Sequence, residues 1–144
     1  MATLHASAVL VGPRAVLIRG PSGSGKSALV VGLLGAADSG LLPFARLVAD
    51  DRVILSAHHG RLLVQAPEAI AGLVERRGHG ILRLPHEPMA IVGRVVDLDA
   101  ADAARLPEEA SGQVVLDGVV LPRTCVAAGV PALPVVIAAL RDPR

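Results

Sequence analysis

One segment of the sequence restricts the possible folds more than any other: Gly20–Ser27, which reads Gly-Pro-Ser-Gly-Ser-Gly-Lys-Ser. It follows the β-type run Ala15–Ile18 and leads into Ser27–Ala37, where apolar residues recur at helical spacing. A strand, a glycine-rich loop and a helix in this order match the pattern G-x-x-x-x-G-K-[ST] in full. The sequence therefore predicts a loop whose backbone N–H groups surround phosphate oxygens at the start of a helix.

Each residue type in this loop has a physical reason to be there. Glycines adopt the sharp turn without steric cost, so that the backbone can approach a phosphate closely. The Lys26 ammonium would reach the β- and γ-phosphates of ATP, and the Ser27 hydroxyl would bind Mg²⁺. Lys26 is the only lysine of the chain, which suits a point charge that arginine does not replace. We expect the nucleotide to be bound by Gly20, Pro21, Ser22, Gly23, Ser24, Gly25, Lys26 and Ser27.

Length and composition limit the chain to one small domain with an aliphatic core. The 144 residues are 52% hydrophobic but include only one Phe and neither Trp nor Tyr. A core of Ala, Val, Leu and Ile in short runs favours buried strands covered by helices. We therefore predict a single α/β domain over residues 1–144.

Charge, aromatic content and hydropathy disfavour several kinds of partner. A net charge of +1 gives no general attraction to nucleic acid, and the near absence of aromatics removes the usual platform for stacked bases. Cys125 is the only cysteine, which excludes a disulfide framework and a cysteine metal site. The longest apolar stretch, Cys125–Leu140, contains Pro131 and Pro134 and is too short to span a bilayer. We expect a cytoplasmic protein that binds neither nucleic acid nor membrane.

Elsewhere the sequence predicts short strands joined by tight turns. Gly12-Pro13 and Asp117-Gly118 separate β-type runs and predict hairpins. We expect further strands at Leu47–Ala49, Val53–Ser56 and Leu62–Gln65, then at Ile81–Leu84 and Ala90–Asp97, with Ala8–Val11, Val114–Leu116 and Val119–Leu121 beside the two turns.

Few helices are expected after the one that follows the phosphate loop. Pro67 and Glu68 suit the first turn of a helix and Arg76-Arg77-Gly78 suits its end, so we predict a helix between them. Asp99 would cap a short helix through Arg105. A loop at Glu108–Gly112 and a last helix from about Leu133 to Arg141 complete the predicted elements.

Two adjacent carboxylates, Asp50-Asp51, follow the expected strand Leu47–Ala49, where a Mg²⁺-organising acid belongs. One could hold the metal ion while the other takes a proton from a hydroxyl nucleophile. Acidic pairs are also common in solvated turns, so the residues alone leave both interpretations open. Taken by itself, Glu75 is better explained as a surface neighbour of arginines. His5 precedes the first strand and could be simply a residue near the terminus.

The order of these residues resembles the HPr kinase/phosphorylases, bacterial enzymes that phosphorylate a serine of the small phosphocarrier protein HPr. The Val-Ala-Asp-Asp segment at this distance from the phosphate loop is more specific than the loop itself. The chain is similar to the short form of the family, the catalytic domain without the usual N-terminal domain. The matching pieces are His5 with Ala8–Val11, Gly20–Ser27, Arg46–Val53 and Glu75–Ile81.

The resemblance implies a role for each matching acid and for the early histidine. Asp50 would be the catalytic base that receives the serine proton, and His5 would assist it. Asp51 and Glu75, together with Ser27, would organise Mg²⁺. None of these roles follows from composition or spacing alone.

The resemblance also implies an α/β P-loop domain of the phosphoenolpyruvate carboxykinase-like type, with a mixed, strongly bent sheet and few helices. The cofactors would be ATP and Mg²⁺, the partner an HPr-like phosphocarrier of a phosphotransferase system, and the assembly a homo-oligomer, typically a hexamer. Many members also run phosphorolysis and carry a basic segment near the C-terminus. The corresponding Val130–Val136 has no basic residue, which argues against phosphorylase activity.

A serine kinase acting on such a carrier is the leading hypothesis, and two others remain. A small-molecule kinase of the ordinary P-loop type would have a regular parallel sheet and an arginine-rich lid, and no lid-sized insertion is visible. A nucleotide-binding regulatory module without catalysis would have lost its base or metal residues. His5, Asp50, Asp51 and Glu75 are all present.

Overall fold

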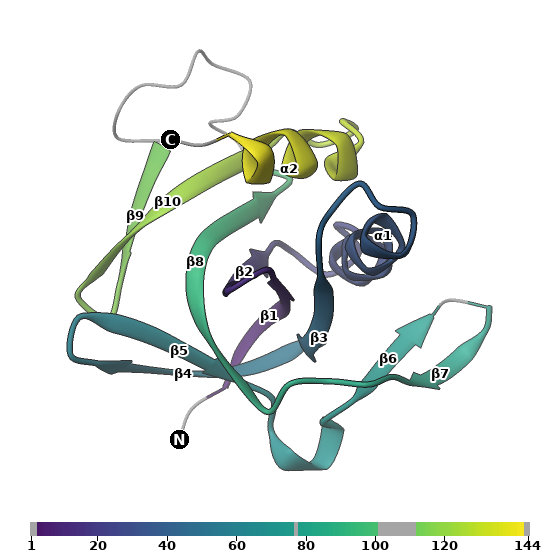
Figure 1. Cartoon of the computed structure of the whole chain (residues 1–144), viewed down its shortest axis with the longest axis horizontal. Coiled ribbons are helices and arrows are strands. Elements are labelled where there is room, and N and C mark those ends of the chain that lie inside the picture. Colours follow the sequence, from purple (N-terminus) through teal and green to yellow (C-terminus); the bar gives the residue numbers. More distant parts are fainter. Residues whose placement is uncertain (1–2, 77, 101–111, 143–144) are drawn as a thin grey trace.

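The computed structural model describes residues 3–76, 78–100 and 112–142 of the chain. Within these residues, two α-helices cover one side of a large mixed sheet (Figure 1), which confirms the predicted α/β class. The elements are β1 (Leu4–Val11), β2 (Arg14–Arg19), α1 (Lys26–Asp38), β3 (Ala45–Ala49), β4 (Arg52–His58), β5 (Arg61–Gln65), the 3₁₀ turn η1 (Glu68–Ile70), β6 (Leu73–Arg76), β7 (Gly80–Arg83), β8 (Met89–Leu98), β9 (Gln113–Leu116), β10 (Val119–Val126) and α2 (Ala132–Arg141).

The central strand is β2, which is hydrogen-bonded on both sides. It pairs antiparallel with β1 and parallel with β8. From β1 the hydrogen-bonded ladder continues through β4 and β5 and returns to β8, so that these strands form a closed circuit. β10 and β9 extend the sheet beyond β8, and β3 pairs with β1. The mixture of parallel and antiparallel neighbours around β8 matches the mixed sheet that the family resemblance implies.

Two apolar clusters occupy opposite faces of this sheet. Side chains alternate along a strand, and along β2 Ala15 and Leu17 belong to one cluster while Val16 and Ile18 belong to the other. The first cluster is built from strands alone, and the second includes both helices. Because β2 is buried on both faces, its sequence is a continuous apolar run rather than an alternating one.

The helices lie side by side on the face that carries the second cluster (Figure 1). Their close approach depends on Gly32, because a Cβ there would lie 3.0 Å from the Leu133 side chain. Both helices were predicted to within one residue at each end. A glycine inside α1 therefore has a packing function that offsets its low helix propensity.

The predicted strands and hairpins are confirmed as well. Gly12-Pro13 joins β1 to β2 and Asp117-Gly118 joins β9 to β10. Asp117 and Gly118 both have positive φ, 49° and 81°, as a type I′ turn requires. Local turn chemistry is enough to place both hairpins.

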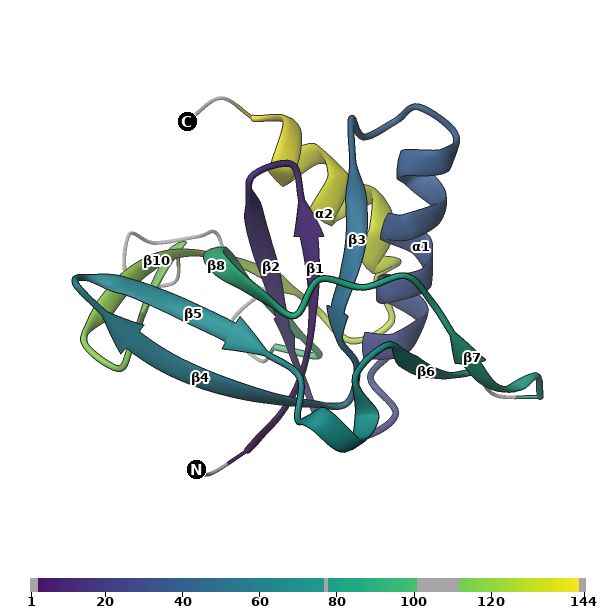
Figure 2. The ribbon, with the colours of Figure 1, turned by 60° about the horizontal axis from the view of Figure 1, so that its bottom comes forward.

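The helix predicted between Pro67 and Gly78 is wrong. Only the single turn η1 forms, and it is followed by β6, which pairs antiparallel with β7. Gly72 interrupts any helix because its φ is +79°, and its backbone passes close to His86. After this break Val74 is buried against the second cluster, and the following residues extend as a two-stranded ribbon that stands apart from the main sheet (Figure 2).

Two further expectations fall on residues 101–111: most of the short helix from Asp99 to Arg105 and most of the loop at Glu108–Gly112. They lie outside the described residues. In the part of the chain that is described, neither helix has the length and apolar character needed to cross a bilayer.

Replacing Gly72 by Ala should destabilise the protein more than replacing Gly60 by Ala. The two glycines have φ of +79° and +78°, so the backbone cost of Ala is matched. Only at Gly72 would the new Cβ meet other atoms, His86 Nδ1 at 2.7 Å and the Leu84 carbonyl oxygen at 3.2 Å. We expect Gly72→Ala to lose about 1 kcal/mol more unfolding free energy in urea titrations. Equal losses would show that this close approach carries no energetic weight.

Candidate functional site

The glycine-rich loop lies between the end of β2 and the start of α1, as the sequence predicted. Gly23 and Gly25 have φ of +82° and +98°, a left-handed conformation that other residues adopt only with strain. Gly25 caps α1 without a side chain, and the first turn of α1 contains no acidic residue. The free N–H groups at this helix start are therefore available to an anion.

A cradle for phosphate is visible in the packing of the loop itself. A Cβ on Gly20 would lie 2.6 Å from Ser24 Oγ and 3.0 Å from Leu98 Cβ, so a larger residue there would require these neighbours to move. The Ser24 hydroxyl is buried and has no hydrogen-bond partner among the described residues. A buried hydroxyl without a partner is costly, and a phosphate oxygen would satisfy it. The loop therefore fits a nucleotide phosphate.

Lys26 directs its positive charge back into the loop. Its side chain is buried, and Nζ donates hydrogen bonds to the carbonyl oxygens of Gly20 at 2.7 Å and Pro21 at 3.1 Å. Among the described residues, the hydrogen bonds of this ammonium therefore go to neutral carbonyl oxygens. Phosphate oxygens would be stronger acceptors for the same ammonium.

Asp50 and Ser27 come together beside the phosphate loop. Asp50 follows β3, whose end lies beside the start of α1 (Figure 2). Ser27 Oγ donates to the Asp50 carboxylate, at 3.0 Å from Oδ1 and 2.9 Å from Oδ2. Only 5% of Asp50 is exposed. A buried carboxylate therefore faces the hydroxyl that the loop motif assigns to Mg²⁺.

The environment of Asp51 differs from that of its neighbour. Asp51 has a φ of +72°, and 68% of its side chain is exposed. Its Oδ1 lies 3.7 Å from Nδ1 of His5, whose side chain is also mostly exposed. An exposed pair at this distance contributes little stability because water screens it. His5 thus lies beside Asp51, and the hydrogen bonds to Asp50 come from serines.

Glu75 lies on the ribbon formed by β6 and β7, opposite Ile81, with its side chain exposed. The ribbon is anchored against α1 through Val74 on its other face. Among the described residues, no three His, Cys, Asp or Glu side chains are grouped so as to hold a metal ion. Asp51 and Glu75 therefore belong to no such group of three, and the set of Ser27, Asp51 and Glu75 stays a prediction.

Sequence reasoning missed Ser7, which contacts the site directly. Ser7 Oγ donates to Asp50 Oδ1 at 2.7 Å and accepts a hydrogen bond from the Asp51 backbone N–H at 3.0 Å. The available signal was a single hydroxyl within the otherwise apolar run Ala6–Val11. A buried hydroxyl in a strand needs a hydrogen-bond partner, and the turn between β3 and β4 provides it.

A cluster of charges around Asp97 was also missed. Arg19, directly before the loop, donates through Nε and Nη2 to both carboxylate oxygens of Asp97, at 2.7 and 2.8 Å. Arg123 on β10 donates to the same carboxylate. Burial by itself raises the pKa of Asp97, but the hydrogen bonds from the two arginines outweigh it and leave that pKa below its ordinary value. The cluster joins β2, β8 and β10 at the entrance to the phosphate loop.

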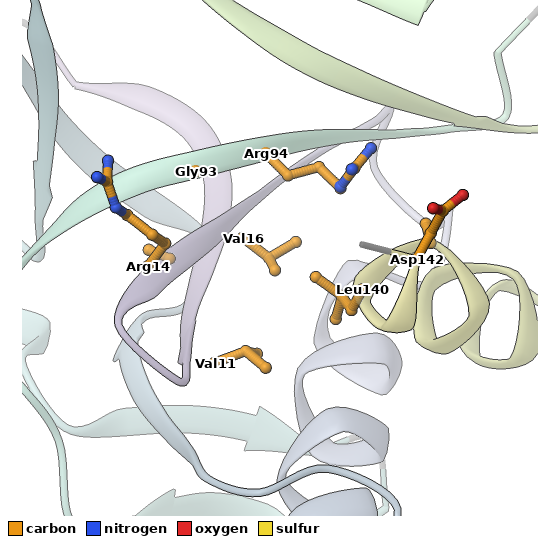
Figure 3. A pocket seen from close by; sticks show the side chains of 9 residues that line it. Val11, Arg14, Val16, Gly93, Arg94, Leu140 and Asp142 are labelled. Atoms are coloured by element: carbon orange, nitrogen blue, oxygen red, sulfur yellow. The ribbon is translucent and has the colours of Figure 1, made fainter. Parts of the chain in front are cut away.

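A separate hollow of about 150 Å³ lies at the opposite end of β2, between β8 and the end of α2 (Figure 3). Its floor is apolar, Val11, Val16 and Leu140, and Arg94 extends over it toward Asp142 while Arg14 points away. Pockets that enclose drug-sized ligands are roughly 300–1,000 Å³. The hollow is too small for a nucleotide and lies away from the loop.

Asp97→Asn should lower stability at neutral pH and reduce the loss of stability in acid. Because the folded-state pKa of Asp97 lies below the unfolded value, its contribution is complete above about pH 5 and disappears as pH falls through the folded pKa. We expect the variant to lose about 1–3 kcal/mol of unfolding free energy at pH 7, and the gap to wild type to shrink toward pH 3. Urea titrations at several pH values measure the loss at pH 7 and its decrease toward pH 3. Asp117→Asn, at an exposed position, is the control. A gap that does not depend on pH would contradict this assignment.

Comparison with known proteins supports the resemblance seen in the sequence. No family model matches the chain. The HPr kinase/phosphorylase of Clostridium tetani is 37% identical over 82 residues, which are 57% of this chain but only 25% of that protein. The structure of the HPr(Ser) kinase/phosphatase from Coxiella burnetii superposes with a TM-score of 0.75, covering 97% of this chain and 93% of that one, at 22% identity. A match in sequence and a shared fold thus confirm the resemblance of this chain to the HPr kinase/phosphorylases.

Proposed function

We propose that the chain is an ATP-dependent protein-serine kinase that phosphorylates HPr or an HPr-like phosphocarrier and so regulates a phosphotransferase system. The observation that carries the proposal is the buried Asp50 carboxylate hydrogen-bonded to Ser27 at the start of the phosphate loop. Similarity to a named HPr kinase/phosphorylase supports the choice of phosphoacceptor. The proposal includes residues 1–144 as one catalytic domain of the phosphoenolpyruvate carboxykinase-like P-loop type. The protein would be cytoplasmic and would assemble as a homo-oligomer, for which the resemblance implies a hexamer.

The phosphate loop would bind the triphosphate of ATP. Its backbone N–H groups and the unpartnered Ser24 hydroxyl would receive phosphate oxygens. Lys26 would exchange the carbonyl oxygens of Gly20 and Pro21 for phosphate oxygens. These contacts favour the binding of phosphate groups because each uses a donor that the protein leaves weakly satisfied or unsatisfied.

The Mg²⁺ site would be completed by the nucleotide. Mg²⁺ in kinases is usually held by one or two carboxylates together with phosphate oxygens and water, so a cage made only of protein ligands is not needed. Ser27 would bind the ion, with Asp51 and Glu75 as the further ligands that the resemblance implies. The ion would neutralise charge on the phosphates. Oxygen ligands of this kind suit Mg²⁺ better than a softer metal.

Asp50 would act as the general base. In the reaction the serine Oγ of the carrier bonds to the γ-phosphorus, and the bond from that phosphorus to the β–γ bridging oxygen breaks, which releases ADP. The serine proton passes to the Asp50 carboxylate. Ser27 would help to hold the ion, and the Asp50 carboxylate lies within 3.0 Å of Ser27 Oγ. Asp50 would therefore be close enough to the phosphate loop to accept a proton from an incoming hydroxyl. His5 would assist from beside Asp51.

Phosphorolysis is not part of the proposal. The resemblance links dephosphorylation to a basic segment that longer family members carry near the C-terminus. The corresponding segment here, Val130–Val136, has no basic residue. Within it, Val130 is exposed and the remainder leads into α2.

The direct test is to incubate the purified protein with Mg-ATP and a panel of HPr-type carriers, and to map phosphorylation by intact mass and peptide sequencing. A carrier phosphorylated on serine supports the proposal and identifies the partner. Nucleotide binding without transfer to any carrier would instead favour the regulatory module or the small-molecule kinase.

Asp50→Asn should reduce phosphoryl transfer by about 100-fold or more, because a general base contributes on this order, while ATP affinity is largely retained. The exposed Asp38→Asn is the matched control, and its transfer rate should equal that of wild type. Full transfer by Asp50→Asn would remove the base assignment. Steady-state kinetics and a fluorescent-nucleotide titration separate the two effects.

Lys26→Ala should weaken ATP binding roughly 10-fold or more, since a charge-assisted hydrogen bond contributes about 1.5–3 kcal/mol. Lys26→Arg should not restore affinity, because the buried Lys26 ammonium acts as a compact point charge close to the Gly20 carbonyl oxygen, and a guanidinium is larger and planar. Calorimetric titration with Mg-ATP measures both variants. Wild-type affinity in Lys26→Ala would rule out the phosphate loop as the nucleotide site.

A further inference from the structure

Ser7 lies in β1 in an environment that would suit an apolar residue. It is fully buried, and its neighbours Ala6 and Ala8 are fully buried within the sheet. A hydroxyl at such a position costs free energy unless both its hydrogen-bonding functions are used. Ser7 is one of few polar side chains buried in the described part of the chain, and two of the others are Lys26 and Asp50.

Both functions of the Ser7 hydroxyl are used, and their directions are fixed. The backbone N–H of Asp51 can only donate, so the Ser7 oxygen is the acceptor in that 3.0 Å contact. The hydroxyl proton is then directed to Asp50 Oδ1, 2.7 Å away. Ser7 therefore binds the carboxylate of one acidic residue and the backbone of the next.

The backbone around the acidic pair depends on β1 as well. Asp51 adopts a left-handed φ of +72°, which costs free energy for a residue other than glycine. Its N–H is held by Ser7, and its carbonyl oxygen accepts a hydrogen bond from the Ala6 N–H at 3.2 Å. β1 thus binds this strained turn on both sides of the Asp51 Cα.

We infer that Ser7 is a positioning residue for the phosphoryl transfer proposed above, on which this inference rests. Its hydroxyl holds the Asp50 carboxylate in the orientation that meets Ser27, and its oxygen fixes the turn that separates the roles of Asp50 and Asp51. Ser7 donates to Oδ1, whereas Ser27 Oγ lies 3.0 Å from Oδ1 and 2.9 Å from Oδ2. Because a carboxylate oxygen accepts more than one hydrogen bond, Oδ2, which Ser7 leaves free, would also accept the hydroxyl of the phosphoacceptor. Ser7 itself touches neither nucleotide nor acceptor in this scheme.

A purely structural role for Ser7 predicts a different pattern of defects. Loss of a buried hydrogen bond would then lower stability and leave the rate constant of the folded fraction unchanged. A positioning role predicts a fall in kcat with little change in KM for ATP, because the nucleotide contacts lie in the loop and the orientation of the base affects only the chemical step.

The experiment compares Ser7→Ala, Ser7→Thr and Ser7→Cys with wild type, and uses Ser39→Ala as a control that removes an exposed hydroxyl bonded to the Ala36 carbonyl oxygen. We expect Ser7→Ala to lower kcat for carrier phosphorylation about 10- to 100-fold with KM for Mg-ATP changed less than about twofold. Ser7→Thr, which keeps the hydroxyl, should recover most of kcat. Ser7→Cys, of similar size but a weak donor, should lie between them and replaces Ser7→Ala if the latter does not fold.

Crystal structures of wild type and the Ala variant provide a readout that does not depend on transfer. We expect the Asp50 carboxylate to rotate away from Ser27 Oγ when the Ser7 hydroxyl is removed. If wild type phosphorylates no carrier, the proposed function fails, and the crystal structures alone decide the inference about Ser7. If wild type is active and Ser7→Ala retains its kcat, or if Asp50 keeps its contact with Ser27 in the variant, the inference is overturned while the proposed function stands.

Discussion

The burial of β2 on both faces and along both edges is the constraint on which the rest of the molecule depends. Its residues Ala15–Ile18 contribute to both apolar clusters, and its two ladders hold β1 on one side and β8 on the other. Because the strand is fixed so completely, the chain that leaves it at Gly20 enters the turn from a rigid base. The glycine conformations, the helix start and the Lys26 side chain can then be arranged within tenths of an ångström, as a phosphate site requires.

Local signals in the sequence were sufficient for the phosphate loop and for most of the strands. The Gly20–Ser27 motif and the Asp117-Gly118 turn determine backbone geometry through the residues themselves, so that distant contacts are not needed to identify them. The prediction of a helix after Pro67 was wrong for the opposite reason. Its helix-like ends are local, but the backbone of Gly72 lies against His86 and Val74 is drawn into the cluster beneath α1. Tertiary packing overrode the local preference there.

The candidate site shows the same division between local and distant information. Asp50 and Asp51 are identical in type and adjacent in sequence, and nothing local distinguishes a buried carboxylate from an exposed one. The difference is made by Ser7, 43 residues before Asp50, which binds the first side chain and the second backbone. The contact between Arg19 and Asp97 spans 78 residues, and no local sequence pattern indicates it either. The contacts that complete the site therefore depend on strands that pair over long sequence separations, and the local motifs do not indicate them.

The closed circuit of strands also has a consequence for the order in which the molecule acquires its site. Ser7, the phosphate loop and Asp50 all belong to the first half of the chain, whereas β8, which completes the second edge of β2, belongs to the second half. Contacts of such large sequence separation carry the greater loop-closure entropy, so we expect the pairing of β2 with β8 to slow folding. During synthesis, the residues of the site emerge well before the strand that fixes them. A chain that ended before β8 would therefore carry the phosphate-loop motif on a β2 strand with one unpaired edge.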